Sequence, residues 1–431
     1  MLSQEKFPWI RNKVRAAKNL AFIHGSRRRF RRFEASFHPE TWRRHDSLLA
    51  WAESQVASFD EEESLRLYRE SEDPVVRQGY KLATSAVQQF RNRCREFDHI
   101  RILIHVPPAT VSSAGFSLFS NFLQSFRFLG VPVREFGWFD DTREILEDFQ
   151  PTVLLTSDHD GYLSRINWKS IAEYRQTRPL GVGLTASLQE YGNTSLQNRL
   201  NWADQHDVNF YYSFRAPQYV SERYRPFFER GYQILHLEFG ANPLLYYPVP
   251  GIKRDLNYVF LGSSNPDKRD RLYSYCGPVF SEYPGYIDGP WWSSIAGFGS
   301  PETHRFLCAR AKVGLNLHIQ NQIDWACELN ERTYNLAACG VPQLIDAPKL
   351  LFARFQPDSF FVADTPAEYK NQFKDIMNDP QEAQRRALQA QREVFTNHTV
   401  FHRVKAFVES LLRQAGRSPN EIRLEGERMK S

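Results

Sequence analysis

The chain has 431 residues, of which 42% are hydrophobic and 24% charged, and its formal net charge is +5. That length exceeds one ordinary core and predicts two or three globular domains. No run of ~18 apolar residues occurs, so the sequence predicts no transmembrane helix. Five scattered cysteines without paired metal spacing indicate a reducing compartment. We therefore expect a cytoplasmic protein that meets a membrane only peripherally, on its inner face.

Residues 1–98 predict a basic, helical N-terminal extension, with helices at Lys6–Ile23, His45–Phe59 and Asp73–Phe97. Between the first two lies the cluster Arg27–Phe33, which holds five arginines and two phenylalanines. We expect this cluster to be a solvated helical face or a tail. Two alternatives stay open. Basic residues interleaved with aromatics also suit anionic lipid headgroups. Nucleic-acid binding is less favoured, because no further basic and aromatic surface follows.

Residues 99–250 alternate between short apolar strands and helices. The expected strands are Arg101–Val106, Val131–Phe136, Thr152–Thr156, Leu180–Leu184, Asn209–Ser213 and Leu235–Glu238. The expected helices include Ser117–Leu129, Thr142–Asp148 and Trp168–Gln176. This order predicts a doubly wound parallel sheet, whose ligands sit at the carboxyl ends of the strands.

Residues 251–395 repeat the alternation after a linker marked by Pro248 and Pro250. The expected strands are Leu256–Leu261, Gly285–Ile287, Val313–His318, Gln343–Ile345 and Phe360–Val362. Charged or amphipathic helices are expected from Lys268, at Pro301–Ala311, after Glu328, at Thr365–Met377, and from Gln381 to about Gly416. The stretch 396–416 should close the fold, and 417–431 should be a polar tail. The fold class is thus predicted as α/β, with two Rossmann-like doubly wound domains facing a cleft and an N-terminal helical extension.

The most informative stretch is Glu328–Asp346, because it reads as a helix with a polar first turn. Small residues follow, Gly340 ends the helix, and an apolar strand comes next. The start of such a helix presents free backbone N–H groups and a partial positive charge. That is a place to hold a phosphate. We expect Arg332 to contact a diphosphate, since its planar fork matches phosphate oxygens. A salt bridge with a nearby carboxylate is the alternative.

Three motifs carry a resemblance to a known family: Tyr258–Ser263, the run from Asn330 to Gly340, and Asn397–Thr399. In this order and spacing they resemble the two-Rossmann (GT-B) glycosyltransferases, and within these the spore-maturation-protein-like group with a "glycosyl transferases group 1" C-terminal domain. The resemblance covers about residues 100–412, most firmly from 255 onward. It implies a second lobe that binds a nucleotide-sugar donor and a first lobe that binds the acceptor. It also implies retention of configuration.

In that family a glutamate that binds the donor ribose commonly precedes the small-residue stretch, and this chain has Asn335 there. An amide can still bond a diol, but without the charge-assisted bond. The earlier acidic position is Glu328 or Glu331. Polar residues that follow the two strands nearest this helix complete the expected donor site. These are Gly262, Ser263, Arg269, Asn316 and His318.

The acceptor side is expected in the first lobe. Gly115 and Ser117 follow its first strand, and Asp158-His159-Asp160 follow its third. An Asp-x-Asp pattern can hold a divalent cation, but we expect a polar loop here and no metal site. His159 or Asp160 is the candidate general base. The alternative for each of these residues is an ordinary turn or a packed polar side chain.

These features predict a glycosyltransferase that moves a sugar from a nucleotide-diphosphate donor to a glycan, lipid-linked or protein acceptor, such as a cell-envelope glycan. Its catalytic residues would be His159, Asp160 and Arg332. No cofactor besides the donor is expected, and nucleic acid is an unlikely partner. Two alternatives share the fold: a catalytically silent nucleotide-sugar sensor or scaffold, and a nucleotide-sugar epimerase.

Overall fold

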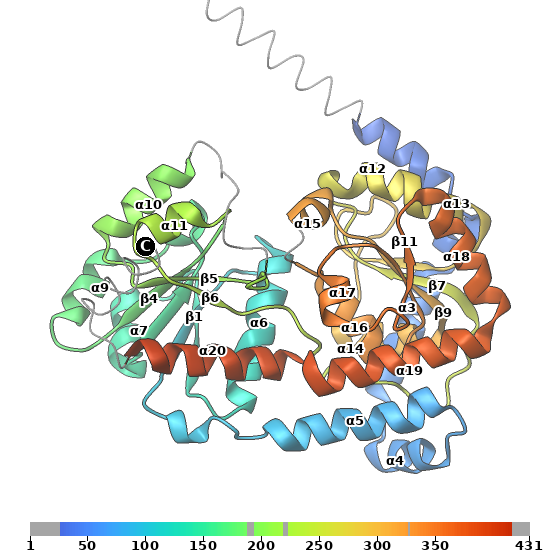
Figure 1. Cartoon of the computed structure of the whole chain (residues 1–431), viewed down its shortest axis with the longest axis horizontal. Coiled ribbons are helices and arrows are strands. Elements are labelled where there is room, and N and C mark those ends of the chain that lie inside the picture. The colour runs from blue at the N-terminus through green and yellow to red at the C-terminus, as the bar shows by residue number, and fades with distance from the viewer. Residues whose placement is uncertain (1–25, 188–193, 219–222, 326–327, 416–431) are drawn as a thin grey trace, which may run out of the picture.

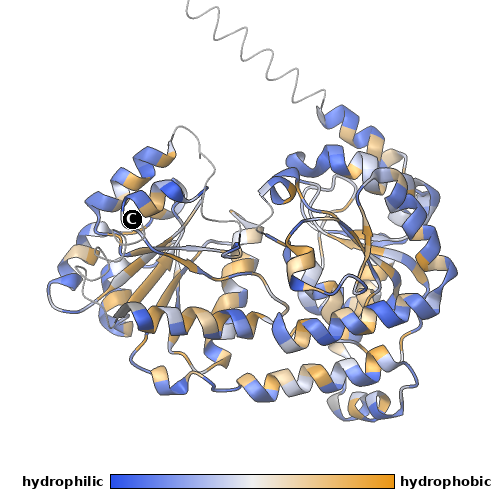
Figure 2. Cartoon of the chain, in the orientation of Figure 1, coloured by the Kyte–Doolittle hydropathy of each residue, from blue (hydrophilic) through white to orange (hydrophobic). Residues whose placement is uncertain are grey.

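The computed structural model of the protein describes residues 26–187, 194–218, 223–325 and 328–415. Two parallel sheets form two α/β lobes that lie side by side (Figure 1). Apolar strands fill the centre of each lobe and polar helix faces cover the outside (Figure 2). The predicted fold class, two Rossmann-like lobes with an N-terminal helical region, is confirmed. The predicted helix at Lys6–Ile23 and the polar tail 417–431 lie outside the described residues.

The first sheet has six strands in the order β2-β1-β3-β4-β5-β6. They are β1 (Ile102–Val106), β2 (Val133–Gly137), β3 (Val153–Thr156), β4 (Gly181–Thr185), β5 (Phe210–Ser213) and β6 (Ile234–His236). All strand pairs are parallel. Ile102 of β1 is in register with Val133 of β2 and with Val153 of β3. Fully buried runs such as Ile102–Val106 are typical of a strand covered on both faces.

The second sheet has five strands in the order β11-β10-β9-β7-β8. They are β7 (Leu256–Leu261), β8 (Tyr286–Asp288), β9 (Ala311–Asn316), β10 (Gln343–Asp346) and β11 (Phe361–Ala363). In chain order this is the 2-1-3-4-5 arrangement that the first sheet also follows. Each predicted strand is present, with ends within about two residues, which is the uncertainty expected for element boundaries.

Helices cover both faces of each sheet. In and before the first lobe they are α2 (Pro39–Arg43), α3 (His45–Ala57), α4 (Glu61–Glu70), α5 (Pro74–Phe90), α6 (Ser113–Phe128), α7 (Thr142–Phe149), α8 (Asp160–Leu163), α9 (Trp168–Arg175), α10 (Leu196–Gln205) and α11 (Arg225–Glu229). In and after the second they are α12 (Arg269–Arg271), α13 (Gly277–Glu282), α14 (Pro301–Arg310), α15 (Gln320–Trp325), α16 (Glu331–Ala338), α17 (Leu351–Arg354), α18 (Pro366–Asn378), α19 (Pro380–Asn397) and α20 (Val400–Ala415). Within the described ranges no helix is both long and apolar enough to cross a bilayer.

The N-terminal helices are part of the second lobe. Residues 26–35 form a helix, and Phe30 and Phe37, each 3% exposed, belong to the apolar core around β7 and Trp292. Glu34 is buried and accepts hydrogen bonds from the backbone N–H and the hydroxyl of Ser293. The arginines of the predicted basic cluster are exposed as expected, but Phe30 is not, because it fills a gap in the second lobe.

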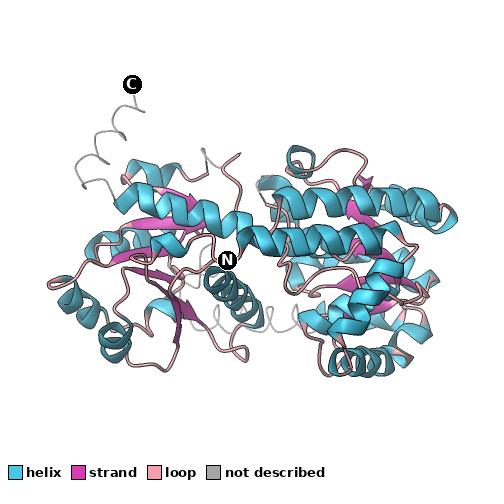
Figure 3. Ribbon diagram, turned by 90° about the horizontal axis from the view of Figure 1, so that it is seen from below, coloured by secondary structure: helices cyan, strands magenta, loops and turns pink. Residues whose placement is uncertain are grey.

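Three helices connect the lobes along one side of the molecule (Figures 1 and 3). The helix predicted from Gln381 to Gly416 is in fact two helices. α19 packs on α5, and α20 enters the core of the first lobe. The break falls at His398 and Thr399 because Thr399 pairs with Ala241 across an isolated backbone bridge. The helix predicted to run to Phe97 likewise ends at Phe90, since the backbone of Arg91 turns out of the helical conformation (ψ 120°) and Asn92 is left-handed (φ 57°).

Candidate functional site

The second sheet changes direction between β7 and β9. The chain leaves β7 for the edge strand β8 on one side, and continues from β9 to β10 and β11 on the other. A crevice opens where neighbouring parallel strands send their connections to opposite sides, and ligands of open α/β sheets bind there. In this lobe that position lies between Leu261, which ends β7, and Asn316, which ends β9, and we refer to it below as the crevice.

Arg332 lies in this crevice. It comes from the first turn of α16, whose N-cap Asn330 accepts a hydrogen bond from the Thr333 N–H at 3.1 Å. The Arg332 Nε donates to the Leu261 carbonyl, and the guanidinium lies 4.5 Å over the Phe260 ring. A Cβ on Gly262 would be 1.5 Å from the Arg332 Nη2. A glycine at this position is therefore needed for the arginine to lie across the end of β7.

The positive charge of Arg332 has no carboxylate in contact with it. Its Nη1 is 3.4 Å from the Asn316 Oδ1, and no described Asp or Glu forms an ion pair with it. Burial lowers the pKa of the guanidinium to about 10. A buried cation is stable only when it is paired or hydrogen-bonded. The alternative expected from the sequence, a structural salt bridge for Arg332, is thus not what the described residues form.

Lys268 is a second buried cation beside Arg332. It ends a short 3-10 helix (Pro266–Lys268), is 7% exposed, and forms no ion pair with a described residue. Burial, and then the charge of Arg332, lower its pKa to about 7. Near it in the chain, the fully buried Ser264 hydroxyl has no hydrogen-bond partner in the described part. Two cations and a free hydroxyl fit an anion with several oxygens.

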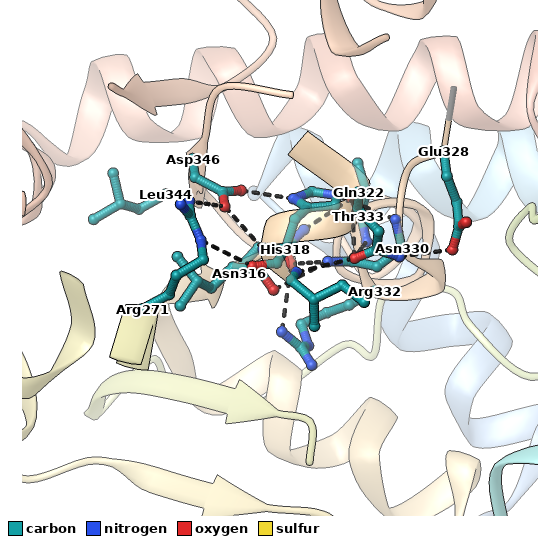
Figure 4. Close-up of polar contacts among 12 residues, drawn as sticks. Arg271, Asn316, His318, Gln322, Glu328, Asn330, Arg332, Thr333, Leu344 and Asp346 are labelled. Carbon is teal, nitrogen blue, oxygen red and sulfur yellow. Dashed lines mark hydrogen bonds and ion pairs between the residues drawn. The ribbon is translucent and has the colours of Figure 1, made fainter. Parts of the chain in front are cut away.

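Behind the crevice, a network fixes the start of α16 (Figure 4). The His318 Nδ1 lies 2.6 Å from Asp346, and its Nε2 accepts from the Asn330 N–H at 3.1 Å. The Asn316 side chain donates to the Thr333 hydroxyl at 2.9 Å. Burial acts to raise the pKa of Asp346, but His318 and Arg271 outweigh it and hold the pKa below its usual value. His318 and Asn316, both predicted to touch the donor, thus hold the helix that carries Arg332.

The other polar residues of this segment face different neighbours. Glu328 lies 3.2 Å from the Arg215 Nε of the first lobe and accepts from Gln322 at 2.7 Å. Glu331 accepts from the Asn121 amide of α6 at 3.2 Å, and burial raises its pKa to about 7. The buried Asn335 Oδ1 has no hydrogen-bond donor among the described residues. Because Arg215 follows β5 and Glu328 follows β9, the carboxyl-terminal loops of the two sheets meet at this place.

The buried Glu331 predicts a pH-dependent stability. Its pKa in the folded protein is raised, so its contribution to stability is full below about pH 4.5 and is lost as the pH rises through about 7. We expect Glu331→Gln to stabilise the protein at pH 8 by about 1–2 kcal/mol and to have little effect near pH 4.5. Thermal unfolding at both values measures the difference. Glu328→Gln, which loses the ion pair with Arg215, should instead destabilise, and an equal effect of Glu331→Gln at both pH values would contradict the prediction.

The first-lobe candidates already have partners. Asp158 is 1% exposed, forms an ion pair with Arg199 and accepts from the Thr185 hydroxyl at 2.8 Å. Burial raises its pKa to about 6, although Arg199 opposes the shift. The His159 Nδ1 caps α8 by accepting from the Gly161 N–H at 3.0 Å, and Asp160 accepts from the Thr194 hydroxyl at 2.5 Å. These three residues do come together after β3, but Asp158 is a structural carboxylate.

The remaining predicted residues are spread over both lobes. Gly115 is in the first turn of α6, where its N–H donates to the cap Ser112 at 3.1 Å, and Ser117 is exposed on the same helix. Ser263 is half-buried beside Gly262. The Arg269 guanidinium stacks 4.1 Å over Phe30, and its Nε donates to the Ser264 carbonyl. These contacts hold the loop after β7 and do not point Arg269 into the crevice. No group of three or more metal-ligating side chains occurs in the described ranges.

Sequence reasoning missed Lys268 and Ser264. Lys268 was expected only as the start of a charged helix, and the donor site was expected to include its neighbours Gly262, Ser263 and Arg269. Its burial follows from the 3-10 turn that Pro266 begins, which rotates the lysine inward while Arg269 and Arg271 remain outside the core. The signal available in the sequence was the turn of small residues after β7, which is followed by Lys268.

The second lobe is similar in sequence to a family of transferases. Residues 269–409 match the family model described as "Glycosyl transferase-like". Among curated proteins, none matches the chain.

Solved structures give a likeness of fold. Sucrose-phosphate synthase from Thermosynechococcus elongatus is 12% identical with a TM-score of 0.49, covering 73% of this chain and 99% of its own. HepE from Anabaena, solved in complex with UDP and glucose, is 12% identical with a TM-score of 0.49, covering 73% and 100%. The T4 phage β-glucosyltransferase in complex with UDP-glucose is 9% identical with a TM-score of 0.45, covering 74% and 100%. Likeness at this level says nothing about activity.

Proposed function

We propose that the protein is a glycosyltransferase that transfers a sugar from a nucleotide-diphosphate donor. One observation carries the proposal: the half-buried Arg332 and the buried Lys268 lie at the direction change of the second sheet, and no described carboxylate forms an ion pair with either. A diphosphate placed there would neutralise both. The match of residues 269–409 to a glycosyl transferase-like model supports the same reading.

In the proposed reaction, Arg332 and Lys268 stabilise the negative charge that develops on the leaving diphosphate. The free N–H groups at the start of α16 add to this field. The orphaned Asn335 Oδ1 accepts a hydrogen bond from a ribose hydroxyl, since buried acceptors are normally satisfied. The donor is the only small molecule this scheme needs. Retention of configuration is proposed by resemblance to the GT-B family alone.

Trp291 is the proposed platform for the nucleotide base. It follows β8, adopts φ 75°, and its side chain is 65% exposed. Left-handed backbone is rare for a bulky residue and tends to occur at functional sites. The next residue, Trp292, donates from Nε1 to the Gly262 carbonyl at 2.8 Å, so this loop joins the crevice. An exposed indole at this position offers a flat face on which a base can stack.

The acceptor is proposed to bind at the carboxyl end of the first sheet, near Gly115, Ser117 and the His159-Asp160 pair. His159 or Asp160 remains the proposed general base there. A glycan, a lipid-linked sugar or a protein would each suit this position. The expected cytoplasmic location, with contact at the inner face of a membrane, is part of the same proposal.

A silent nucleotide-sugar sensor is the second candidate function. It is favoured by Asn335 in place of a glutamate and by Glu328, whose carboxylate is engaged by Arg215 and Gln322.

Thermal-shift screening against UDP-, GDP-, ADP- and dTDP-sugars tests donor binding, because a ligand that binds only the folded state raises the melting temperature. A sugar-dependent release of nucleotide then separates the enzyme from the sensor. Release of an altered free sugar nucleotide would instead indicate an epimerase, and no shift with any donor would refute the proposal.

A further inference from the structure

The N-terminal helix 26–35 presents a basic face from a fixed position. Arg27, Arg28, Arg31 and Arg32 are all exposed, and none forms an ion pair with a described residue. In a helix these positions lie on one side, since residues three and four apart are neighbours. The helix therefore concentrates four unneutralised charges on one surface.

The opposite side of the same helix is anchored in the second lobe. Phe30 packs against Trp292 with ring centroids 5.8 Å apart, and Phe33 packs edge-on against Tyr273 at 4.5 Å. Glu34, the only acidic residue of this helix, points inward and is bonded to Ser293. The arginines are thus held in place by a packed core, in contrast to the charges of a free tail, and the acidic residue of their own helix forms no ion pair with them.

The basic face also has a defined place on the molecule. Helix 26–35 lies beside α12, on the side of the second lobe opposite to the connecting helices α5, α19 and α20 (Figure 1). The contacts agree, because Arg29 forms an ion pair with Asp270 of α12 at 3.6 Å. A partner bound to this face would therefore leave the three connecting helices uncovered.

The sequence that precedes the helix is also basic, and it contains aromatic and aliphatic residues. Residues 1–25 hold five Lys or Arg residues and one glutamate, interleaved with apolar side chains. The apolar ones include Phe7, Trp9, Ile10, Leu20, Phe22 and Ile23. Headgroup regions of membranes favour this mixture, because aromatic side chains sit at the interface while basic ones attract anionic lipids. Binding to nucleic acid would use the charges but leave the apolar residues without a partner.

We infer that the basic face of helix 26–35 docks the protein on an anionic lipid bilayer. The occupant is the membrane surface, and the four arginines supply the attraction to its headgroups. The inference deepens the membrane contact proposed above by naming the surface of the protein and the charge of the lipid, and it holds whether or not Arg332 binds a donor.

Co-sedimentation of the full-length protein with lipid vesicles tests the inference. We expect binding to vesicles of phosphatidylcholine with phosphatidylglycerol, and little binding to phosphatidylcholine alone. Binding should be lost at ~1 M salt, where the Debye length falls to about 3 Å. The variant Arg27→Gln/Arg28→Gln/Arg31→Gln/Arg32→Gln should bind at least tenfold more weakly, and the same four positions changed to lysine should bind like the wild type.

A matched control removes four charges elsewhere. Arg77, Arg93, Arg95 and Arg127 are exposed, and their replacement by glutamine lowers the net charge equally. This control should keep vesicle binding, and all variants should keep their response to nucleotide sugars in thermal-shift assays. Undiminished binding by the helix variant would overturn the inference, as would an equal loss in both glutamine variants. Tighter binding of the wild type to a DNA duplex than to anionic vesicles would assign the face to nucleic acid instead.

Discussion

Replacing Arg332 with alanine should weaken the binding of a nucleoside diphosphate by about ten- to hundredfold, the effect of losing a charged hydrogen bond worth roughly 1.5–3 kcal/mol. The guanidinium already lies across the end of β7 without a carboxylate partner, so it is free to contact phosphate oxygens. Isothermal titration with UDP, or with the diphosphate found by screening, measures the change. Arg332→Ala should also relieve a buried charge and therefore should not unfold the second lobe.

A second variant displaces the Arg332 guanidinium without changing Arg332 itself. In Gly262→Ala the new Cβ would be 1.5 Å from the Arg332 Nη2, which forces the guanidinium out of the crevice. It should reproduce the loss of affinity with Arg332 intact. Arg310→Ala is the control, because Arg310 pairs with Asp255 just before β7, at the opposite end of the strand. Wild-type affinity in both Arg332→Ala and Gly262→Ala would remove this crevice from the donor site.

Replacing Lys268 with methionine should raise stability and lower affinity. Burial depresses the pKa of Lys268 to about 7, so the folded protein without ligand disfavours the charged form that the unfolded chain prefers. The cost is full below about pH 7 and is relieved as the pH rises towards the ordinary lysine value. Lys268→Met removes it, and should stabilise the ligand-free protein at pH 7 by roughly 2–4 kcal/mol. Diphosphate binding should fall by about tenfold or more.

The same lysine gives the affinity a pH dependence. Above pH 7 the free protein loses the Lys268 proton, and diphosphate binding must then take one up. Affinity should therefore fall by up to about tenfold for each pH unit between 7 and 9. Lys268→Arg keeps its charge throughout, so its affinity should change little over this range. The difference between the two proteins therefore shows how much of the pH dependence comes from Lys268 and how much from the phosphates. A Lys268→Met protein that is less stable than the wild type at pH 7 would show that the lysine is paired.

The strands were predictable because both sheets are parallel and covered on both faces. Buried strands of this kind are short and mostly apolar, as in β1 and β7, where a single polar residue interrupts the run. The start of α16 was also predictable, since Asn330 is a strong N-cap and Gly340 ends the helix. Local sequence rules act over a few residues, and these features are local.

What the sequence could not reveal depends on distant partners. The Asp158-His159-Asp160 pattern was expected to form a polar loop after a strand, but the sequence could not show that Arg199 and Thr185 bind Asp158 from elsewhere in the first lobe. Whether Arg332 or Lys268 has a carboxylate partner depends in the same way on what the folded chain brings near. Phe30 of the basic cluster could not be assigned to a core because its neighbour, Trp292, lies some 260 positions later.

The crossing of the chain between lobes limits how they can move. The chain crosses between the lobes three times: once after α5, once near Ala241 and once near His398. The last two crossings are tied together, because the Ala241 N–H donates to the His398 carbonyl at 3.1 Å and the Val400 N–H to the Ala241 carbonyl at 2.8 Å. A Cβ on Gly240 would be 2.7 Å from the Thr399 backbone, so these two segments of the chain are in close contact. These two crossings must therefore move together when the lobes open or close, and the connection after α5 must bend with them. A side chain at Gly240 would push the two paired segments apart.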